Sequence, residues 1–164
     1  DGHVSALIPP GEKVSLPKKP TEKEFADCCN EFWWLAPYAA KGLWRDELPY
    51  ARTILDDYMR TQLMKMLTWY VGVKTDFAGD PGKLGKYMKN FLPRDWWLTL
   101  LKTYGDASNE HTWEGLFAMT SLFRQAAKFV VAHLSFKYPE EDDKRVSAHL
   151  HHVRSLPADA SEIY

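Results

Sequence analysis

Apolar residues recur at steps of three and four along most of this chain, which is the spacing of one face of an α-helix. No segment alternates apolar and polar residues at the period of two that a half-buried β-strand requires. The connections between the apolar runs are short, so consecutive helices are expected to pack antiparallel. The pattern predicts an all-α fold, an antiparallel up-and-down bundle of five to six helices. These helices are expected over residues 21–44, 47–72, 86–91, 93–104, 109–134 and 141–154.

The first part of the chain, residues 1–20, differs from the rest because it is rich in proline and has little periodicity. We interpret it as a linker. The helical domain, residues 21–164, then starts at Thr21, which forms a capping-box pattern with Glu24. Because the linker begins at Asp1 rather than at a methionine, we expect an upstream domain that is absent from this chain.

The predicted helix over residues 21–44 carries two stripes on opposite faces. One stripe is apolar and has the character of a core face. The other is offset from it by two residues, about 200° around the helix. A face of this kind is either a solvated surface or one wall of a binding site. Surface helices rarely present Trp and Tyr to solvent, which favours the binding site. We call it the polar–aromatic stripe, and its members are Asp27, Glu31, Trp34, Tyr38, Lys41 and Arg45.

Each part of the polar–aromatic stripe suits a different chemical group. The two acids, one turn apart, form a compact anionic site for an amine or a guanidinium. The two aromatic residues can stack on a ring or lie over a cation. The two bases suit a phosphate. The alternative is that acids near the start of a helix and bases near its end only complement the helix dipole.

A second group of acids and aromatic residues lies at the start of the predicted helix over residues 109–134. Glu110 and Glu114 are one turn apart, with Trp113 beside them. This group could form a second wall, opposite the polar–aromatic stripe. The alternative, which the pattern favours, is that the acids serve the helix dipole above core aromatic residues.

Composition excludes several classes of protein. The net charge is −1, and a nucleic-acid binder would normally show a basic excess. No apolar run approaches the length of about 18 residues needed to cross a membrane. Cys28 and Cys29 are adjacent, a usage typical of a reducing cytoplasm. No arrangement of side chains supports a catalytic or a metal-binding assignment in this chain.

Several segments, in the same order, resemble the streptomycin (aminoglycoside) 6-adenylyltransferase family. The similarity extends over roughly residues 18–164 and is specific because several motifs contribute to it. The segments that carry it are EFWWLAPYAAKGLWRDEL (31–48), GKY (85–87), WEGLF (113–117), YPEEDD (138–143) and RSLPADASEIY (154–164).

The resemblance implies that this chain is the C-terminal helical domain of a two-domain enzyme. In that family, an N-terminal nucleotidyltransferase domain, absent here, holds ATP and Mg²⁺. The implied reaction transfers AMP from ATP to the 6-hydroxyl of streptomycin and confers antibiotic resistance. The helical domain would then hold the cationic drug, and we expect this chain alone to be inactive and to bind no cofactor by itself.

Specific roles follow when the stripe is combined with the resemblance. Asp27 and Glu31 would bind the cationic groups of the aminoglycoside, and Trp34 and Tyr38 would pack on its rings. Lys41, with Arg45 second, would reach the triphosphate. The general base is expected in the missing domain. The competing hypothesis is a non-enzymatic helical module that binds a partner protein through the Trp34 and Tyr38 face.

Overall fold

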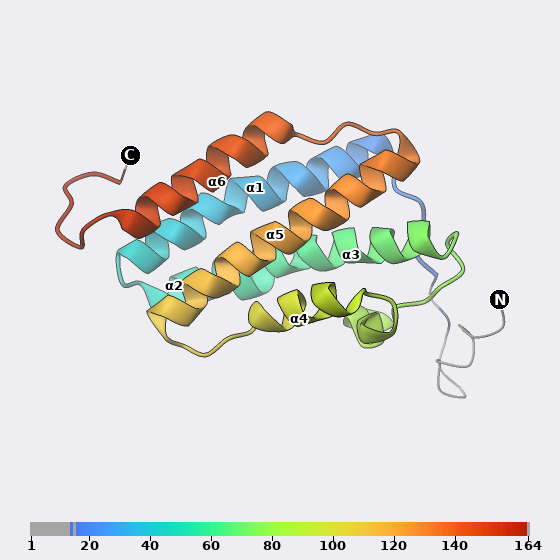
Figure 1. Cartoon of the computed structure of the whole chain (residues 1–164), viewed down its shortest axis with the longest axis horizontal. Coiled ribbons are helices and arrows are strands. Elements are labelled where there is room, and N and C mark those ends of the chain that lie inside the picture. Colours follow the sequence, from blue (N-terminus) through green and yellow to red (C-terminus); the bar gives the residue numbers. More distant parts are fainter. Residues whose placement is uncertain (1–13, 15, 164) are drawn as a thin grey trace.

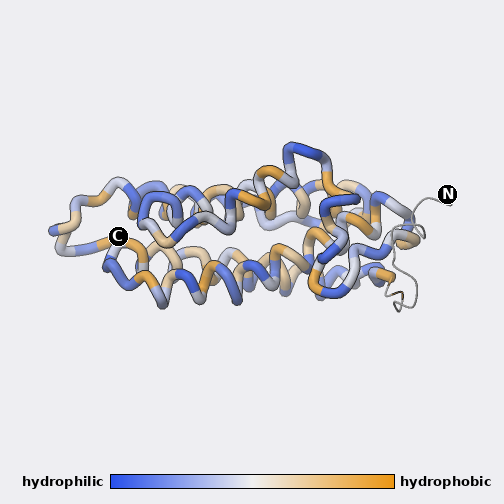
Figure 2. Tube along the Cα trace, turned by 90° about the horizontal axis from the view of Figure 1, so that it is seen from below, coloured by the Kyte–Doolittle hydropathy of each residue, from blue (hydrophilic) through white to orange (hydrophobic). Residues whose placement is uncertain are grey.

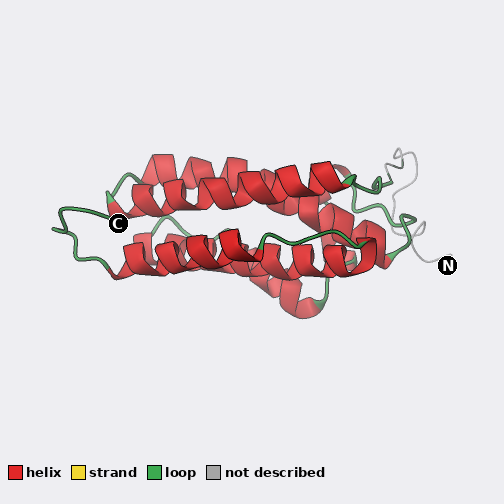
Figure 3. Cartoon of the chain, turned by 90° about the horizontal axis from the view of Figure 1, so that it is seen from above, coloured by secondary structure: helices red, strands yellow, loops and turns green. Residues whose placement is uncertain are grey.

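The computed structural model describes residues 14 and 16–163, and every regular element in this part of the chain is a helix (Figures 1 and 3). The prediction of an all-α bundle is confirmed. Most of the predicted linker lies outside the described residues. The elements are α1 (Glu22–Trp44), α2 (Leu48–Thr53), η2 (Ile54–Met59), α3 (Arg60–Lys74), η3 (Lys83–Gly85), η4 (Met88–Asn90), α4 (Arg94–Lys102), α5 (Asn109–Leu134) and α6 (Glu140–Ser155).

The helix starts follow the capping chemistry of the sequence. The Thr21 hydroxyl accepts a hydrogen bond from the Glu24 backbone N–H at 3.1 Å, and the Glu24 carboxylate accepts one from the Thr21 N–H at 3.3 Å. This is the predicted capping box, and it satisfies two backbone donors that a helix start leaves unpaired. Ser108 caps α5 in a similar way, accepting from the His111 N–H at 3.0 Å.

The second predicted helix is continuous, but its middle is wider than an α-helix. Its α2 and α3 parts are joined through η2, a π-helical segment, without a break. Close packing of this helix on α1 depends on Gly42, where an added Cβ would lie 2.9 Å from Tyr50 Cδ1. The short helix predicted over residues 86–91 is instead a 3₁₀ turn, η4. It follows Gly82 and Gly85, whose φ angles of 78° and 75° are incompatible with a continuing α-helix.

The helices run along a common axis in an up-and-down order, which brings α1 and α6 side by side and parallel (Figure 1). Hydrophobic positions recur every few residues along each helix (Figure 2). In the core, the Phe32 ring of α1 stacks on the Phe123 ring of α5, with centroids 3.8 Å apart and planes at 2°. None of the helices in the described residues is both long enough and apolar enough to span a bilayer.

An ion pair between the partly buried Arg124 and the buried Asp143 fixes α6 against α5. The Arg124 guanidinium donates to both carboxylate oxygens of Asp143, at 2.6 and 2.8 Å. The Tyr138 hydroxyl donates to the same carboxylate at 2.6 Å, and so does the Ser147 hydroxyl, at 2.8 Å. Burial alone would raise the pKa of Asp143. These donors outweigh burial and hold the pKa below its usual value.

Candidate functional site

Trp34 and Tyr38 form an exposed aromatic surface on α1. Their side chains are 64% and 37% exposed, and their ring centroids lie 5.7 Å apart. The helix register explains this exposure, because the neighbouring Trp33 and Leu35 turn into the core and are 2% and 8% exposed. The polar–aromatic stripe is therefore outside the core, as its spacing predicted.

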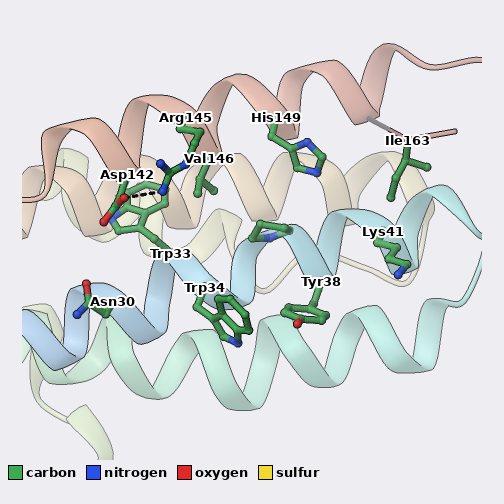
Figure 4. A pocket seen from close by; sticks show the side chains of 11 residues that line it. Asn30, Trp33, Trp34, Tyr38, Lys41, Asp142, Arg145, Val146, His149 and Ile163 are labelled. Carbon is green, nitrogen blue, oxygen red and sulfur yellow. Dashed lines mark hydrogen bonds and ion pairs between the residues drawn. The ribbon is translucent and has the colours of Figure 1, made fainter.

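This aromatic surface borders a pocket of about 520 Å³ between α1 and α6 (Figure 4). Ligand pockets for small molecules commonly have volumes of roughly 300–1,000 Å³. The pocket runs along two parallel helices, so residues early in both helices lie at one end and residues late in both lie at the other. The lining residues are Asn30, Trp33, Trp34, Pro37, Tyr38, Lys41, Asp142, Arg145, Val146, His149 and Ile163.

At the end formed by the early residues, Asp142 is paired with Arg145, whose Nη2 donates to Asp142 Oδ1 at 2.6 Å. The Trp33 indole lies beside this pair in Figure 4. Its Nε1 is buried and has no hydrogen-bond partner, the one such side-chain nitrogen or oxygen in the described part of the chain. A buried donor without an acceptor is unfavourable.

The other end of the pocket is basic and is closed by the C-terminal tail. Lys41 and His149 line it, together with Ile163, which is 7% exposed. The Trp44 Nε1–H donates to the Pro157 carbonyl at 3.3 Å and ties the start of the tail to α1. Burial, with a contribution from a neighbouring histidine, lowers the pKa of His149, so the ring is mainly neutral at neutral pH.

The two acids of the polar–aromatic stripe line an adjoining, shallower hollow of about 420 Å³. Asp27 and Glu31 form this hollow with Asn30 and Trp34, which also belong to the larger pocket. Lys23 Nζ lies 2.6 Å from Asp27 Oδ2, and both side chains are largely exposed. An exposed pair of this kind is weak, so a ligand cation can compete with Lys23 for the carboxylate.

The structure does not bring every predicted site residue to this surface. Arg45 lies beyond the pocket, with its Nε 4.0 Å from a Glu47 carboxylate oxygen. Trp113 is 5% exposed and belongs to the core, as expected if the acids beside it only serve the helix dipole. Glu114 lines a separate hollow beside α4. Glu110 is exposed and lines neither hollow of the α1 surface.

Glu110, Trp113 and Glu114 therefore form no part of the lining of this pocket. The wall opposite the stripe is α6, which packs beside α1, whereas Glu114 near the start of α5 lines a separate hollow. Sequence reasoning missed the residues that α6 supplies. Asp142 lies within the YPEEDD segment that carries the family resemblance, but its position in an acidic first turn was consistent with a helix-dipole role alone. The lining residues missing from the predicted site are Asn30, Trp33, Pro37, Asp142, Arg145, Val146, His149 and Ile163.

The arrangement suits binding rather than bond-making chemistry. It combines an aromatic surface, carboxylates at one end and a lysine at the other. Within the described residues, no group of three or more His, Cys, Asp or Glu side chains is placed to hold a metal ion.

Known proteins resemble this chain in sequence and in fold. The chain is 34% identical over 143 residues to the aminoglycoside 6-adenylyltransferase of Bacillus subtilis, a match that covers 87% of this chain and 50% of that protein. It is 39% identical over 127 residues to the enzyme of the same name from Campylobacter jejuni, covering 77% of this chain and 44% of that protein. The chain thus spans about half the length of the curated relatives it matches.

A crystal structure of an aminoglycoside 6-adenyltransferase from Bacillus subtilis superimposes with a TM-score of 0.77 at 33% identity. The superposition covers 89% of this chain and 57% of that one. A family model described as streptomycin adenylyltransferase matches residues 1–153. Because this match extends over most of the chain and the fold agrees, the chain belongs to the streptomycin adenylyltransferase family.

Proposed function

We propose that this chain is the aminoglycoside-binding half of an enzyme that transfers AMP from ATP to the 6-hydroxyl of a streptomycin-like aminoglycoside. Relatives named aminoglycoside 6-adenylyltransferase, of which this chain matches about half, support the activity and its role in antibiotic resistance. The observation that carries the proposal is the α1 surface, where acidic, aromatic and basic side chains follow one another in order along a pocket.

In this proposal, the acidic end of the surface holds the drug. An aminoglycoside carries several cationic groups on rings rich in hydroxyls. Asp27 and Glu31 attract the cations, and charge-assisted hydrogen bonds fix their positions. Trp34 and Tyr38 offer an aromatic surface of matching size to the faces of the rings. The pocket's volume of about 520 Å³ favours a small molecule over the flat contact that a protein partner would make.

The basic end would face the nucleotide. During the reaction, the 6-hydroxyl oxygen forms a bond to the α-phosphorus of ATP, and the bond from that phosphorus to pyrophosphate breaks. Lys41, with Arg45 beyond it, would stabilise the negative charge of the phosphates. Mg²⁺, when bound, would neutralise part of that charge from outside this set of residues. Glu110, Trp113 and Glu114 lie away from this pocket and have no role in the proposal.

A calorimetric titration of this chain with streptomycin tests the drug-binding part. We expect saturable binding that Asp27→Asn combined with Glu31→Gln weakens about tenfold or more, because charge-assisted hydrogen bonds are lost. A control that removes two exposed acids elsewhere, Asp57→Asn with Glu141→Gln, changes the net charge equally. Affinity should then stay close to that of the unchanged chain. An equal loss in both double variants would contradict the assigned site.

Activity is tested on a protein that contains both halves. Lys41→Ala should raise the Michaelis constant for ATP or lower turnover while leaving streptomycin binding intact. We expect this chain alone to release no pyrophosphate from ATP with Mg²⁺ and streptomycin. Release above background would overturn that expectation.

The non-enzymatic alternative, a helical module that binds a partner protein through the Trp34 and Tyr38 face, makes the opposite prediction. Streptomycin would then show no saturable binding to this chain.

A further inference from the structure

Two adjacent acids of α6 have different environments. Asp143 is 4% exposed and accepts hydrogen bonds from Arg124, Tyr138 and Ser147, so its carboxylate is fully used by the fold. The Asp142 side chain is 44% exposed and lines the pocket between α1 and α6. Of the two acids, only Asp142 offers its carboxylate to a ligand.

The cation that holds Asp142 is one that a ligand can replace. Arg145 lies one turn later on the same helix, and its side chain is 75% exposed. An ion pair in such a position contributes little to stability, because water competes for both groups and ordering the long side chain costs entropy. The pair can therefore open without disturbing the packing of α6.

The surroundings of Asp142 define what the ligand must carry. The Trp33 indole lines the pocket together with this carboxylate. The Trp34 and Tyr38 rings call for a molecule with a face to stack. The carboxylate calls for a cation, and a planar guanidinium fits it best because two parallel hydrogen bonds can form. A ring with a guanidinium or ammonium substituent meets both of these requirements.

From these contacts, and resting on the function proposed above, we infer that Asp142 binds a cationic group of the aminoglycoside and that Arg145 occupies this carboxylate until the ligand displaces it. Asn30 and Trp34 connect this position to the hollow of Asp27 and Glu31. One molecule can therefore engage acids from both helices. Arg145 acts as an internal competitor, so its removal should strengthen binding.

The chain contains a matched control for this pair. Glu141 and Lys144 also lie three residues apart on α6, with carboxylate and ammonium 3.9 Å apart. Their side chains are 89% and 72% exposed, and neither lines the pocket. Substitutions in this pair change the net charge by the same amount, one residue away from Asp142 and Arg145. They report any long-range electrostatic effect without contact with the ligand.

The experiment is a calorimetric titration of this chain with streptomycin, which carries guanidinium groups. We expect Asp142→Asn to weaken binding about tenfold or more, because a charge-assisted hydrogen bond is lost. Arg145→Ala should strengthen binding severalfold. Glu141→Gln and Lys144→Ala should each change affinity much less than the corresponding pocket variant. When Asp142→Asn and Arg145→Ala are combined, the gain in affinity from Arg145→Ala should disappear, because no carboxylate remains to be released.

The possible outcomes separate the two proposals. If the unchanged chain binds streptomycin and Asp142→Asn has no more effect than Glu141→Gln, the inference is wrong while the proposed function stands. The same holds if Arg145→Ala has only the effect of Lys144→Ala, or if its gain persists without the Asp142 carboxylate. If the unchanged chain shows no saturable binding, the proposed function fails and the inference fails with it. Circular dichroism melting confirms that each variant is folded.

Discussion

Replacing Arg124 by methionine tests the account of how α6 is held against α5. The substitution keeps much of the apolar stem but removes the guanidinium that donates two hydrogen bonds to Asp143. The Tyr138 and Ser147 hydroxyls remain as donors, but no positive charge remains next to the buried carboxylate. Because the Asp143 side chain is only 5% exposed, water cannot replace what the guanidinium provided.

The expected loss of stability at neutral pH is about 3 kcal/mol, the lower end of the range for breaking a buried pair from one side. We take the lower end because the Arg124 side chain is 31% exposed in the native pair, so its own desolvation is incomplete. For a chain of this length, such a loss lowers the melting temperature by roughly 6–12 °C. Arg145→Met removes the exposed Arg145–Asp142 pair within α6 and should cost no more than about 1 kcal/mol of stability.

The pH dependence gives an independent check. The folded-state pKa of Asp143 lies below its usual value, so its contribution is present above the unfolded-state pKa of about 3.9 and is lost as the pH falls through the folded-state value. Without Arg124, burial has the larger influence and raises this pKa. The difference in stability between the two proteins should therefore be greatest at about pH 7 and shrink towards about pH 4.

Urea denaturation followed by circular dichroism measures the free energy of unfolding of Arg124→Met, Arg145→Met and the unchanged chain at both pH values. A double variant, Arg124→Met with Asp143→Leu, removes the stranded charge and should recover part of the loss. The reasoning is refuted if the two arginine variants lose equal stability. A loss for Arg124→Met that is the same at both pH values would refute it as well.

Two further predictions concern the core. Burial raises the pKa of the Cys28 thiol to about 12 and raises that of Cys29 as well, so neither should react with Ellman's reagent at about pH 8 until the chain is unfolded; rapid reaction of the folded chain would show that the α1 core face opens to solvent. Phe123→Ala removes the ring that stacks on Phe32 and should lower the free energy of unfolding, measured by urea denaturation, by about 4 kcal/mol. A loss below about 1 kcal/mol would contradict this packing role.

Only the part of the candidate site that lies on a single helix was predictable from the sequence. The spacing of Trp34, Tyr38 and Lys41 placed them on one face of α1, and they do line one pocket. The same spacing placed Arg45 with them, but it lies beyond the pocket, next to Glu47. Periodicity shows which residues share a face of one helix, but it does not show how far along that face a neighbouring helix extends.

The sequence by itself determined the local structure. Helix periodicity, the capping box at Thr21 and the glycines after α3 depend on interactions between residues a few positions apart, which the sequence states directly. The motifs in their order were also enough to indicate the family.

Only the tertiary structure decided what faces the polar–aromatic stripe. Trp33 and Asp142 are more than 100 positions apart and share a pocket because α6 returns parallel to α1. An apolar stripe shows that a helix must be covered, but several helices of the bundle could cover it equally well. The choice depends on the packing of complementary surfaces and on contacts such as the Arg124–Asp143 pair, and these exist only once the whole chain has folded.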